Sequence, residues 1–323
     1  MRRAFADTLI RLAGENDRVV FLTGDLGYGT FEKFQERFGP RYVNVGVAEA
    51  QMMCAAAGLA LAGWHPVVYS IASFATARAF EQVRLCISYH DLPVVIVGAG
   101  GGYLYASSGV THHAADDLGL MSIIPAMTVV APADPIEVAE LLPQILQLPG
   151  PAYIRIGKYG EPALDASERP ALGRARCVRD GTDVLVLTTG DMAGVALSAL
   201  SALAGEAIYP LLYQMHTVKP LDTLTLDRLA GRVNSVAVVE EHVPAGGLWA
   251  AVCDWHASHP EHRLRLRRIG APDAHVLGSP GREELRRRIH CDAASIERIV
   301  REMWTGTEVE RQSISMGEVG HWR

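Results

Sequence analysis

The segment "HPVVYSI" (residues 65–71) decides the fold class, because it is apolar at neighbouring positions and too short for a buried helix. A strand that is apolar on both faces is typical of a parallel sheet with helices on both sides. Residues 52–77 contain no Asp, Glu, Lys or Arg, which is a feature of membrane spans. Gly58, Gly63 and Pro66 interrupt this apolar run. We therefore expect a buried helix followed by a buried strand.

Runs of the same kind occur on either side of this strand, between Arg2 and Leu164. They are "RVVFLTG" (18–24), "LPVVIVGAG" (92–100), "MTVVAPAD" (127–134) and "PAYIRIG" (151–157). Segments of helical length separate them, and Asp134 followed by Pro135 is the expected start of one such helix. This alternation predicts a mostly parallel sheet flanked by helices.

A polar, proline-containing stretch, "EPALDASERPALGRAR" (161–176), resembles a linker. After it the alternation resumes with "TDVLVLTTG" (182–190), so we expect a second, smaller α/β domain. The predicted boundaries are 1–165 for the first domain, 176–303 for the second and 304–323 for an extension without periodicity. The predicted fold class is α/β, with two domains that each contain a mostly parallel sheet.

Composition excludes several functional classes. The chain has 323 residues, of which 49% are hydrophobic and 20% charged, and its net charge is -6. This charge gives no basic surface for nucleic acid. Five widely spaced cysteines without a CxxC pair suggest neither a disulfide framework nor a zinc site, and are typical of a reducing cytoplasm, the location we expect. Residues 1–17 have helical periodicity and lack the features of a signal peptide, and we expect no membrane partner.

Glu49 is the first candidate functional residue. It lies within "NVGVAEAQM" (44–52), where its neighbours are small or apolar. A carboxylate that leaves water without a partner costs several kcal/mol, so Glu49 must be exposed, paired or functional. An exposed position in the first turn of a helix would also explain it. The local sequence leaves both interpretations open.

The stretch "SSGVTHHAADD" (107–117) is the second candidate. If it is helical, His112 shares a face with Asp116, and His113 shares one with Asp117. That spacing suits an ion pair, a catalytic group or a metal pair. The glycine-rich segment before it, "VGAGGGYLYASSG" (97–109), lacks the features of a phosphate-binding P-loop.

Two further groups of polar residues follow strands. Arg155 and Lys158 stand at the end of the last strand of the first domain, where an open α/β sheet usually binds its ligand, and they would suit a phosphate or carboxylate. Surface charges explain them equally well. In "VVEEHVPAGGLWAAV" (238–252) we favour a domain contact or a turn over catalysis.

Taken in order, these segments resemble the pyrimidine-binding and C-terminal domains of transketolases, a family of thiamin diphosphate enzymes. The resemblance covers about Arg2 to Met303. Its motifs are "FLTGDLG" (21–27), "RYVNVGVAEAQMMCAAAGLALAGWHPVVYSIASFATARAFEQVR" (41–84), "LPVVIVGAGGG" (92–102), "GVTHHAADDLGLMSIIPAMTVVAPAD" (109–134), "GPAYIRIGK" (150–158), "VKPLD" (218–222) and "VVEEHVPAGGL" (238–248).

This resemblance implies roles at the cofactor. Glu49 would hydrogen-bond N1′ of the aminopyrimidine and so promote activation of thiamin diphosphate. Phe74 would stack on the pyrimidine, and Ile71 occupies a position that often holds a second aromatic residue. Asp25 corresponds to an acidic residue near the cofactor at a subunit interface.

The resemblance also implies roles at the substrate. His112 would face the substrate and orient its hydroxyls or exchange protons with them, which makes a metal role for this stretch unnecessary. Ser108 stands where transketolases usually have an aspartate that recognises an acceptor hydroxyl. Arg155 and Lys158 correspond to residues that hold a substrate phosphate. We expect no metal ligand from this chain.

A Gly-Asp-Gly motif followed by an Asn, which holds Mg²⁺ and the diphosphate in this family, does not occur; "GDLG" (24–27) and "GDM" (190–192) differ from it. The chain therefore resembles one subunit of a split enzyme, paired with a separate pyrophosphate-domain subunit as an α2β2 assembly. The implied activity is transfer of a ketol unit from a sugar-type ketose donor to an aldehyde or ketone acceptor. The alternatives are the β subunit of a 2-oxo acid dehydrogenase decarboxylase component and a catalytically silent partner.

Overall fold

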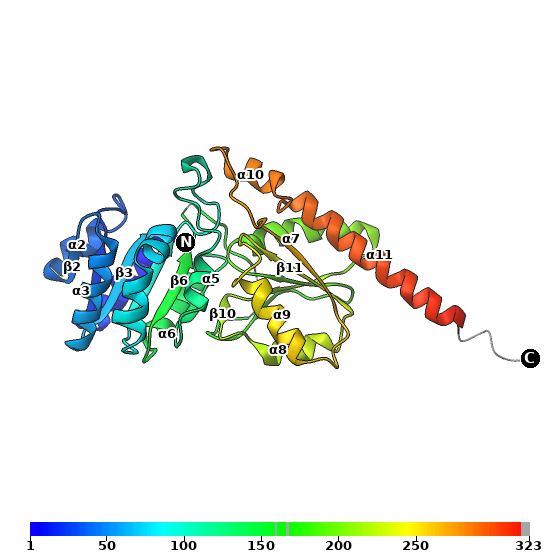
Figure 1. The fold of residues 1–323 in the computed structure, drawn as a ribbon, viewed down its shortest axis with the longest axis horizontal. Helices are drawn as coiled ribbons and strands as arrows, with labels where there is room; N and C mark the ends of the chain where they lie inside the picture. Colours follow the sequence, from blue (N-terminus) through cyan, green and yellow to red (C-terminus); the bar gives the residue numbers. More distant parts are fainter. Residues whose placement is uncertain (159, 166–167, 318–323) are drawn as a thin grey trace, which may run out of the picture.

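The computed structural model describes residues 1–158, 160–165 and 168–317, which form two α/β units side by side (Figure 1). The first contains a seven-stranded sheet and the second a five-stranded sheet. The predicted α/β fold class is confirmed. Charge-free residues 52–77 form the expected buried helix and strand, followed by the start of a helical segment. No helix in the described residues is long and apolar enough to cross a membrane.

The first sheet has the strand order β10-β5-β6-β4-β3-β1-β2. Six strands are parallel to their neighbours, and the seventh, β10, runs antiparallel at the edge beside β5. Strands β1, β4 and β6 are buried along their whole length, as expected for strands that are covered on both faces. The strands are β1 Val19–Thr23, β2 Tyr42–Asn44, β3 His65–Ile71, β4 Val95–Ala99, β5 Thr128–Val130, β6 Ala152–Ile156 and β10 Thr217–Lys219.

Helices cover both faces of this sheet. Asp134 caps α6 as predicted, because its carboxylate accepts a hydrogen bond from the amide of Glu137 at 2.7 Å. The helices are α1 Arg2–Glu15, α2 Glu32–Phe38, α3 Glu49–Leu61, α4 Phe80–Gln82, α5 Asp117–Ser122 and α6 Pro135–Leu146. Short helical turns complete the domain: η1 Gly39–Arg41, η2 Phe74–Arg78, η3 Val83–Ser88 and η4 Ala106–Ser108, of which η2 and η3 are π-helical.

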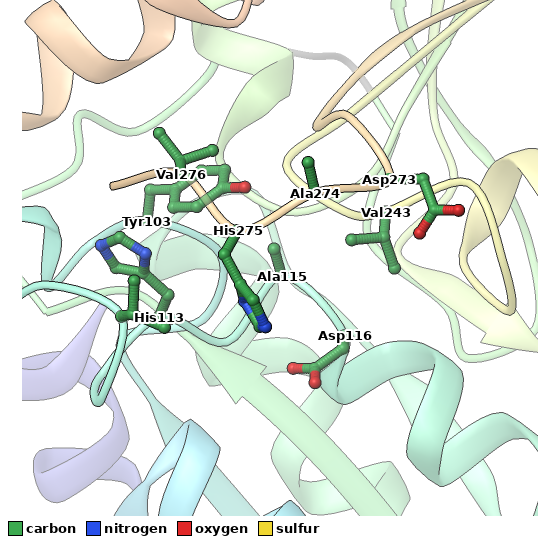
Figure 2. A pocket seen from close by; sticks show the side chains of 10 residues that line it. Tyr103, His113, Ala115, Asp116, Val243, Asp273, Ala274, His275 and Val276 are labelled. Carbon is green, nitrogen blue, oxygen red and sulfur yellow. The ribbon is translucent and has the colours of Figure 1, made fainter. Parts of the chain in front are cut away.

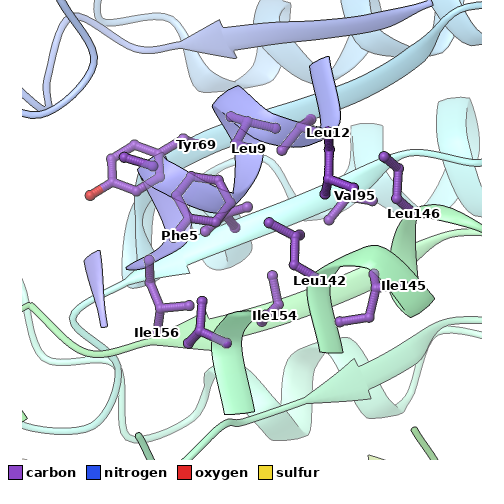
Figure 3. Close-up of a cluster of buried hydrophobic side chains, with 14 of the residues drawn as sticks. Phe5, Leu9, Leu12, Tyr69, Val95, Leu142, Ile145, Leu146, Ile154 and Ile156 are labelled. Carbon is purple, nitrogen blue, oxygen red and sulfur yellow. The ribbon is translucent and has the colours of Figure 1, made fainter. Parts of the chain in front are cut away.

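Alternate residues of each strand enter two different cores. Phe21 and Val67 pack beneath α1 and α6, whereas Leu22 and Val68 pack beneath α3 and η3. Figure 3 shows the first core, in which Phe5 and Leu9 of α1 lie over the strands beside Leu142 of α6. The alternation explains why the strands are apolar at neighbouring positions.

The second sheet has the order β12-β11-β8-β9-β7, with β7 antiparallel to β9 and the others parallel. Its strands are β7 Arg176–Arg179, β8 Leu185–Thr188, β9 Leu211–Gln214, β11 Ser235–Glu240 and β12 Arg265–Gly270. Its helices are α7 Met192–Leu203, α8 Thr223–Ala230, α9 Leu248–Ser258, α10 Arg282–Arg288 and α11 Ala293–Gly317, with the turn η5 Ala204–Glu206.

Three sequence-based expectations differ from the structure. Strand β10 follows the second domain's β9 but joins the first sheet, so the chain crosses between domains after the predicted boundary. Helix α11 continues through Met303 and Trp304, where the sequence predicts the end of the domain, to Gly317. Residues 109–116 form a loop rather than a helix, because Gly102 and Ala114 form a β-bridge that holds the chain extended there.

Candidate active site

Glu49 is the first residue of α3 and only 1% exposed. The hydroxyl of Ser70 donates a hydrogen bond to its Oε1 at 3.2 Å, and Nη1 of Arg78 donates one to its Oε2 at 2.9 Å. The Arg78 side chain is 47% exposed, so the pair joins a buried carboxylate to a cation at the surface. Burial with a partner excludes the interpretation of Glu49 as an exposed helix start.

The position of Glu49 follows from the sheet. Strands β1, β2 and β3 are parallel neighbours, so the residues after each strand meet at one edge. Gly24 follows β1, and a Cβ atom there would lie 3.5 Å from the carbonyl oxygen of Gly46 and 3.8 Å from Oε1 of Glu49. Small residues at this edge thus lie against the carboxylate.

Aromatic and basic side chains form a row beside Glu49. The guanidinium of Arg78 lies 4.0 Å from the centre of the Phe74 ring, which is a cation–π contact. The ring centres of Phe74 and His112 are 5.1 Å apart, and those of His112 and Tyr105 are 5.8 Å apart. Nζ of Lys158 lies 3.8 Å from the centre of the Tyr105 ring. The structure therefore brings together Glu49, Phe74, His112 and Lys158, which come from four segments of the sequence.

Asp25 lies at the same edge of the sheet, in the turn after β1, with a left-handed backbone (φ 57°). Nδ2 of Asn44 donates a hydrogen bond to its Oδ1 at 2.9 Å, and so does the hydroxyl of Tyr28 at 2.8 Å. The hydrogen bond from Asn44 is the main reason that the pKa of Asp25 is lowered, and the one from Tyr28 adds to it. The exposed carboxylate is thus oriented by its neighbours.

Ile71 and Ser108 occupy different surroundings. Ile71 is the last residue of β3, half-buried and three residues before Phe74. Ser108 is exposed at the end of η4, and its carbonyl accepts a hydrogen bond from the Thr111 hydroxyl at 3.4 Å. Oγ1 of Thr111 also lies 2.9 Å from Nδ1 of His112, which fixes the orientation of that ring.

Arg155 is buried, unlike the other residues that we expect to bind the substrate. It is 7% exposed and forms an ion pair with Asp117, to which Nε donates at 3.0 Å. Further hydrogen bonds lead to the carbonyl oxygens of Ala114 and Glu241, and Tyr153 donates to the same aspartate at 2.6 Å. These contacts occupy the guanidinium and hold the loop that carries His112 against β6.

His113 lines a cavity of about 370 Å³ between the two domains. Figure 2 shows its ring beside Tyr103, with the centres 5.0 Å apart, and Asp116 and His275 on the opposite side. Burial lowers the pKa of His113, so the neutral ring is favoured. Because residues 109–116 are not helical, the spacing that would place His113 and Asp117 on one helix face does not apply, and Asp117 forms its ion pair with Arg155. The described residues contain no group of three or more side chains suited to a metal ion.

Sequence reasoning missed Arg78, Ser70, Asn44 and Tyr105. Arg78 did leave a signal, because it is the first charged residue after the charge-free stretch and lies four positions after Phe74. Ser70, Asn44 and Tyr105 left no such signal, because uncharged polar residues at strand ends and in loops are common. The group "VVEEHVPAGGLWAAV" forms the domain contact that we favoured: Glu241 binds Arg282 and Arg286, and its Oε2 accepts a hydrogen bond from the amide of Tyr103 at 2.9 Å.

Comparison with known proteins supplies the family. Residues 1–159 match the transketolase pyrimidine-binding domain, and residues 173–296 match the transketolase C-terminal domain. The 6-deoxy-6-sulfo-D-fructose transketolase subunit SqwH of Clostridium sp. (strain MSTE9) is 36% identical over 84% of this chain and 85% of its own length. An apulose-4-phosphate transketolase subunit of Phocaeicola vulgatus is 31% identical over 85% of this chain and 88% of its own.

A solved structure described as a split gene transketolase, inactive beta4 tetramer, is also similar. It has a TM-score of 0.86 and 32% identity over 94% of this chain and 98% of its own. The matched domains and relatives define an α/β transferase subunit of the thiamin diphosphate-dependent class. The chain belongs to the transketolase family, and it is a transketolase-like subunit of a split enzyme.

Proposed function

We propose that this chain supplies the pyrimidine-binding half of an enzyme that transfers a ketol unit from a ketose donor to an aldehyde or ketone acceptor. The observation that carries the proposal is the buried carboxylate of Glu49 at the carboxyl edge of the sheet, whose partner Arg78 lies over the ring of Phe74. A buried carboxylate fits the N1′ atom of an aminopyrimidine, and the half-buried ring of Phe74 fits its face. When bound, thiamin diphosphate supplies the electron sink for cleavage of a carbon–carbon bond.

The residues of this chain would position that cofactor and move protons. Glu49 would hold the proton that it shares with N1′, because water is excluded around its carboxylate. Arg78 balances the charge of Glu49 when the carboxylate is ionised. His112, which lies beside Phe74 and is oriented by Thr111, would exchange protons with hydroxyl groups of the donor.

We assign the diphosphate and Mg²⁺ to a separate subunit with a pyrophosphate domain, in an α2β2 assembly. The two relatives that are themselves named as subunits of transketolases support this division. Asp25 and Ile71, at the open edge beside Glu49, would then lie close to both the cofactor and the partner.

The donor that we propose is a ketose with an anionic group at its far end, either phosphate or sulfonate. Lys158 lines a hollow of about 520 Å³ that also contains Arg2, Arg3 and Lys33, with Asp7 and Glu32 as its acidic residues. The names of the two relatives contain a sulfo sugar and a sugar phosphate. We assign the anion to Lys158 and not to Arg155, whose guanidinium is bound to Asp117. Ser108 would contact the acceptor in place of the usual aspartate.

The test is to express the chain with a candidate partner that contains the Gly-Asp-Gly motif, add thiamin diphosphate and Mg²⁺, and compare donors. Sugar phosphates, sulfo sugars and 2-oxo acids are each assayed with an aldehyde acceptor. We expect turnover of the anionic ketoses and none of the 2-oxo acids. Turnover of 2-oxo acids alone would instead indicate the decarboxylase-type β subunit. A complex that binds the cofactor and turns over none of these donors would indicate the silent partner.

A further inference from the structure

Two cysteines on neighbouring helical segments of the first domain lie close together. Sγ of Cys54, on α3, is 3.9 Å from Sγ of Cys86, on η3. Cys54 is exposed and Cys86 is half-buried, and both are free thiols. The segments α3 and η3 pack directly against each other. The proposed function uses neither thiol.

We propose that Cys54 and Cys86 form a reversible disulfide bond. A disulfide has an S–S length of about 2.05 Å, so the two sulfur atoms must approach by about 1.9 Å. Rotation about the Cα–Cβ bond of the exposed Cys54 can supply that approach. The other side chains of η3 that pack against the core, such as Val83 and Ile87, can stay in place.

The chemistry needs a two-electron oxidant, for which we name hydrogen peroxide. One thiolate attacks the peroxide to give a sulfenic acid and hydroxide, and the second thiolate then attacks the sulfenic sulfur and releases a second hydroxide. With the two thiol protons the products are one disulfide and two water molecules. A thiol such as dithiothreitol reverses the bond by exchange.

The bond would join the two segments that supply the cofactor side of the site. Cys54 lies five residues after Glu49 in α3, which is about 7.5 Å along the helix axis. Cys86 lies near the end of the helical stretch that also contains Phe74 and Arg78. This consequence rests on the proposed function, whereas formation of the bond can be tested without it.

Oxidation of the full-length chain tests the proposal directly. After treatment with hydrogen peroxide, the thiols measured under denaturing conditions should fall from the five of the sequence to three. Mass spectrometry of the digest should show the Cys54 peptide linked to the Cys86 peptide within one molecule, and dithiothreitol should restore all five thiols. The oxidised protein should also have a higher Tm than the reduced protein, because the bond closes a 32-residue separation in the unfolded chain.

Matched variants complete the experiment. C54S and C86S should each lose both the linked peptide and the increase in Tm, while C253S, which removes a half-buried cysteine of α9, should keep them. The proposal fails if the oxidised wild type keeps five thiols. It also fails if Cys54 is linked to a different cysteine or to a second molecule, or if it is recovered as sulfinic acid. The wild-type peptide map does not depend on whether either serine variant folds.

Discussion

At the scale of single residues, Glu49 is the group on which the proposed activity depends. Replacing it in E49Q keeps the size of the side chain but exchanges one acceptor oxygen for an amide NH2 donor and removes the ability to hold a shared proton. In the assembled enzyme we expect kcat/KM to fall by at least about 100-fold, as for the loss of a general acid or base. Steady-state kinetics with the preferred donor measures this effect.

The matched control is E81Q, because Glu81 is an exposed glutamate of α4. It should keep its activity within about twofold of the wild type. Thermal unfolding of E49Q should remain cooperative, because the Arg78 guanidinium can turn to solvent when its partner is neutral. Wild-type activity in E49Q would contradict the role that we propose for Glu49.

Arg78 is the charged partner of the buried Glu49 carboxylate, to which its Nη1 donates at 2.9 Å. R78M keeps an unbranched side chain but removes the guanidinium over the Phe74 ring, and it leaves the carboxylate with the Ser70 hydroxyl alone. We expect the free energy of unfolding at neutral pH to fall by about 1–3 kcal/mol, the usual cost of removing one partner of a buried polar group. Urea denaturation measures the difference.

A double-mutant cycle separates this ion pair from general effects on packing. R78M should lower the free energy of unfolding clearly less in an E49Q background than in the wild type, since no buried charge is then left behind. R84M, at an exposed arginine of η3, should change stability by no more than about 0.5 kcal/mol. Equal losses in both backgrounds would show that Arg78 acts through its packing and not through its charge.

At the scale of elements, β10 connects the second domain to the first sheet by pairing with β5. The residue before β10, His216, is buried. The amide of Ala131 donates to the carbonyl of His216, and Nδ1 of His216 lies 2.9 Å from Oγ1 of Thr217. Burial lowers the pKa of His216 to about 4, to which the nearby Arg176 charge adds. The ring is therefore neutral in the folded protein above that pH.

This lowered pKa predicts how stability depends on pH. Below about pH 6.5 the unfolded chain binds a proton on this histidine and the folded chain does not, so stability falls as the pH falls from about 6.5 to about 4. The loss from this one group is about 2 kcal/mol at pH 5. H216N should not show this loss. As the pH falls, the free energy of unfolding of the wild type should therefore approach that of H216N or fall below it.

The control is H290N, at an exposed histidine with a left-handed backbone that asparagine tolerates. Urea denaturation at pH 7.5 and pH 5 measures all three proteins. H290N should follow the pH dependence of the wild type. If H216N follows it as well, the acid sensitivity has another source.

An element of this fold could be predicted from the sequence when the contacts that determine it lie close together in the chain. Strand β3 and helix α6 were predictable, because apolar runs and the capping pair Asp134–Glu137 act within a few residues. Strand β10 was not, since its pairing with β5 joins residues almost 90 positions apart, Thr217 with Val130. The loop at 109–116 was mistaken for a possible helix because the bridge from Gly102 to Ala114 leaves no periodic signal.

In the candidate site, too, some features follow from the sequence and others depend on contacts between distant segments. Glu49, Phe74, His112 and Lys158 were named from the sequence through motifs of the family, and the fold brings them to one edge of the sheet. Arg155 was assigned to the substrate from its strand-end position and from the resemblance to the family. What decides its surroundings is Asp117, 38 residues away in sequence, which binds it in the interior. Sequence position places a side chain at an edge, but the packing of distant segments decides whether it reaches solvent.

At the scale of the whole molecule, an ion cluster of the second domain meets the first domain at their junction, where Oε2 of Glu241 accepts a hydrogen bond from the Tyr103 amide. Glu241 follows β11 and is fully buried, with Arg282 and Arg286 of α10 as its partners. Asp191, at the start of α7, binds the same two guanidinium groups. Burial opposes ionisation of Glu241, but the two guanidinium groups outweigh it and hold its pKa well below the usual range. The cluster is thus charged at every pH at which the protein would function.

E241Q keeps the acceptor for the Tyr103 amide but removes the buried carboxylate that binds both guanidinium groups, which leaves Arg282 with Asp191 and leaves Arg286 with Asp191 and the exposed Glu283. We expect it to lower the free energy of unfolding by about 3 kcal/mol, within the range for breaking a buried pair. Because the pKa of Glu241 is lowered by folding, the stability that the wild type gains from it is present above about pH 4.5 and is lost as the pH falls below that value.

The wild type and E241Q should therefore converge in stability on acidification, which is a stricter test than the loss at neutral pH. The matched control is E283Q, which removes an exposed carboxylate bound to the same Arg286 and should cost less than about 1 kcal/mol. Hydrogen exchange should show faster exchange of the Tyr103 amide in E241Q than in E283Q. Tyr103 begins the loop that leads to His112, so faster exchange of its amide would show that the loss of Glu241 loosens the chain toward the candidate active site. An unchanged exchange rate would show that the cluster stabilises the second domain only.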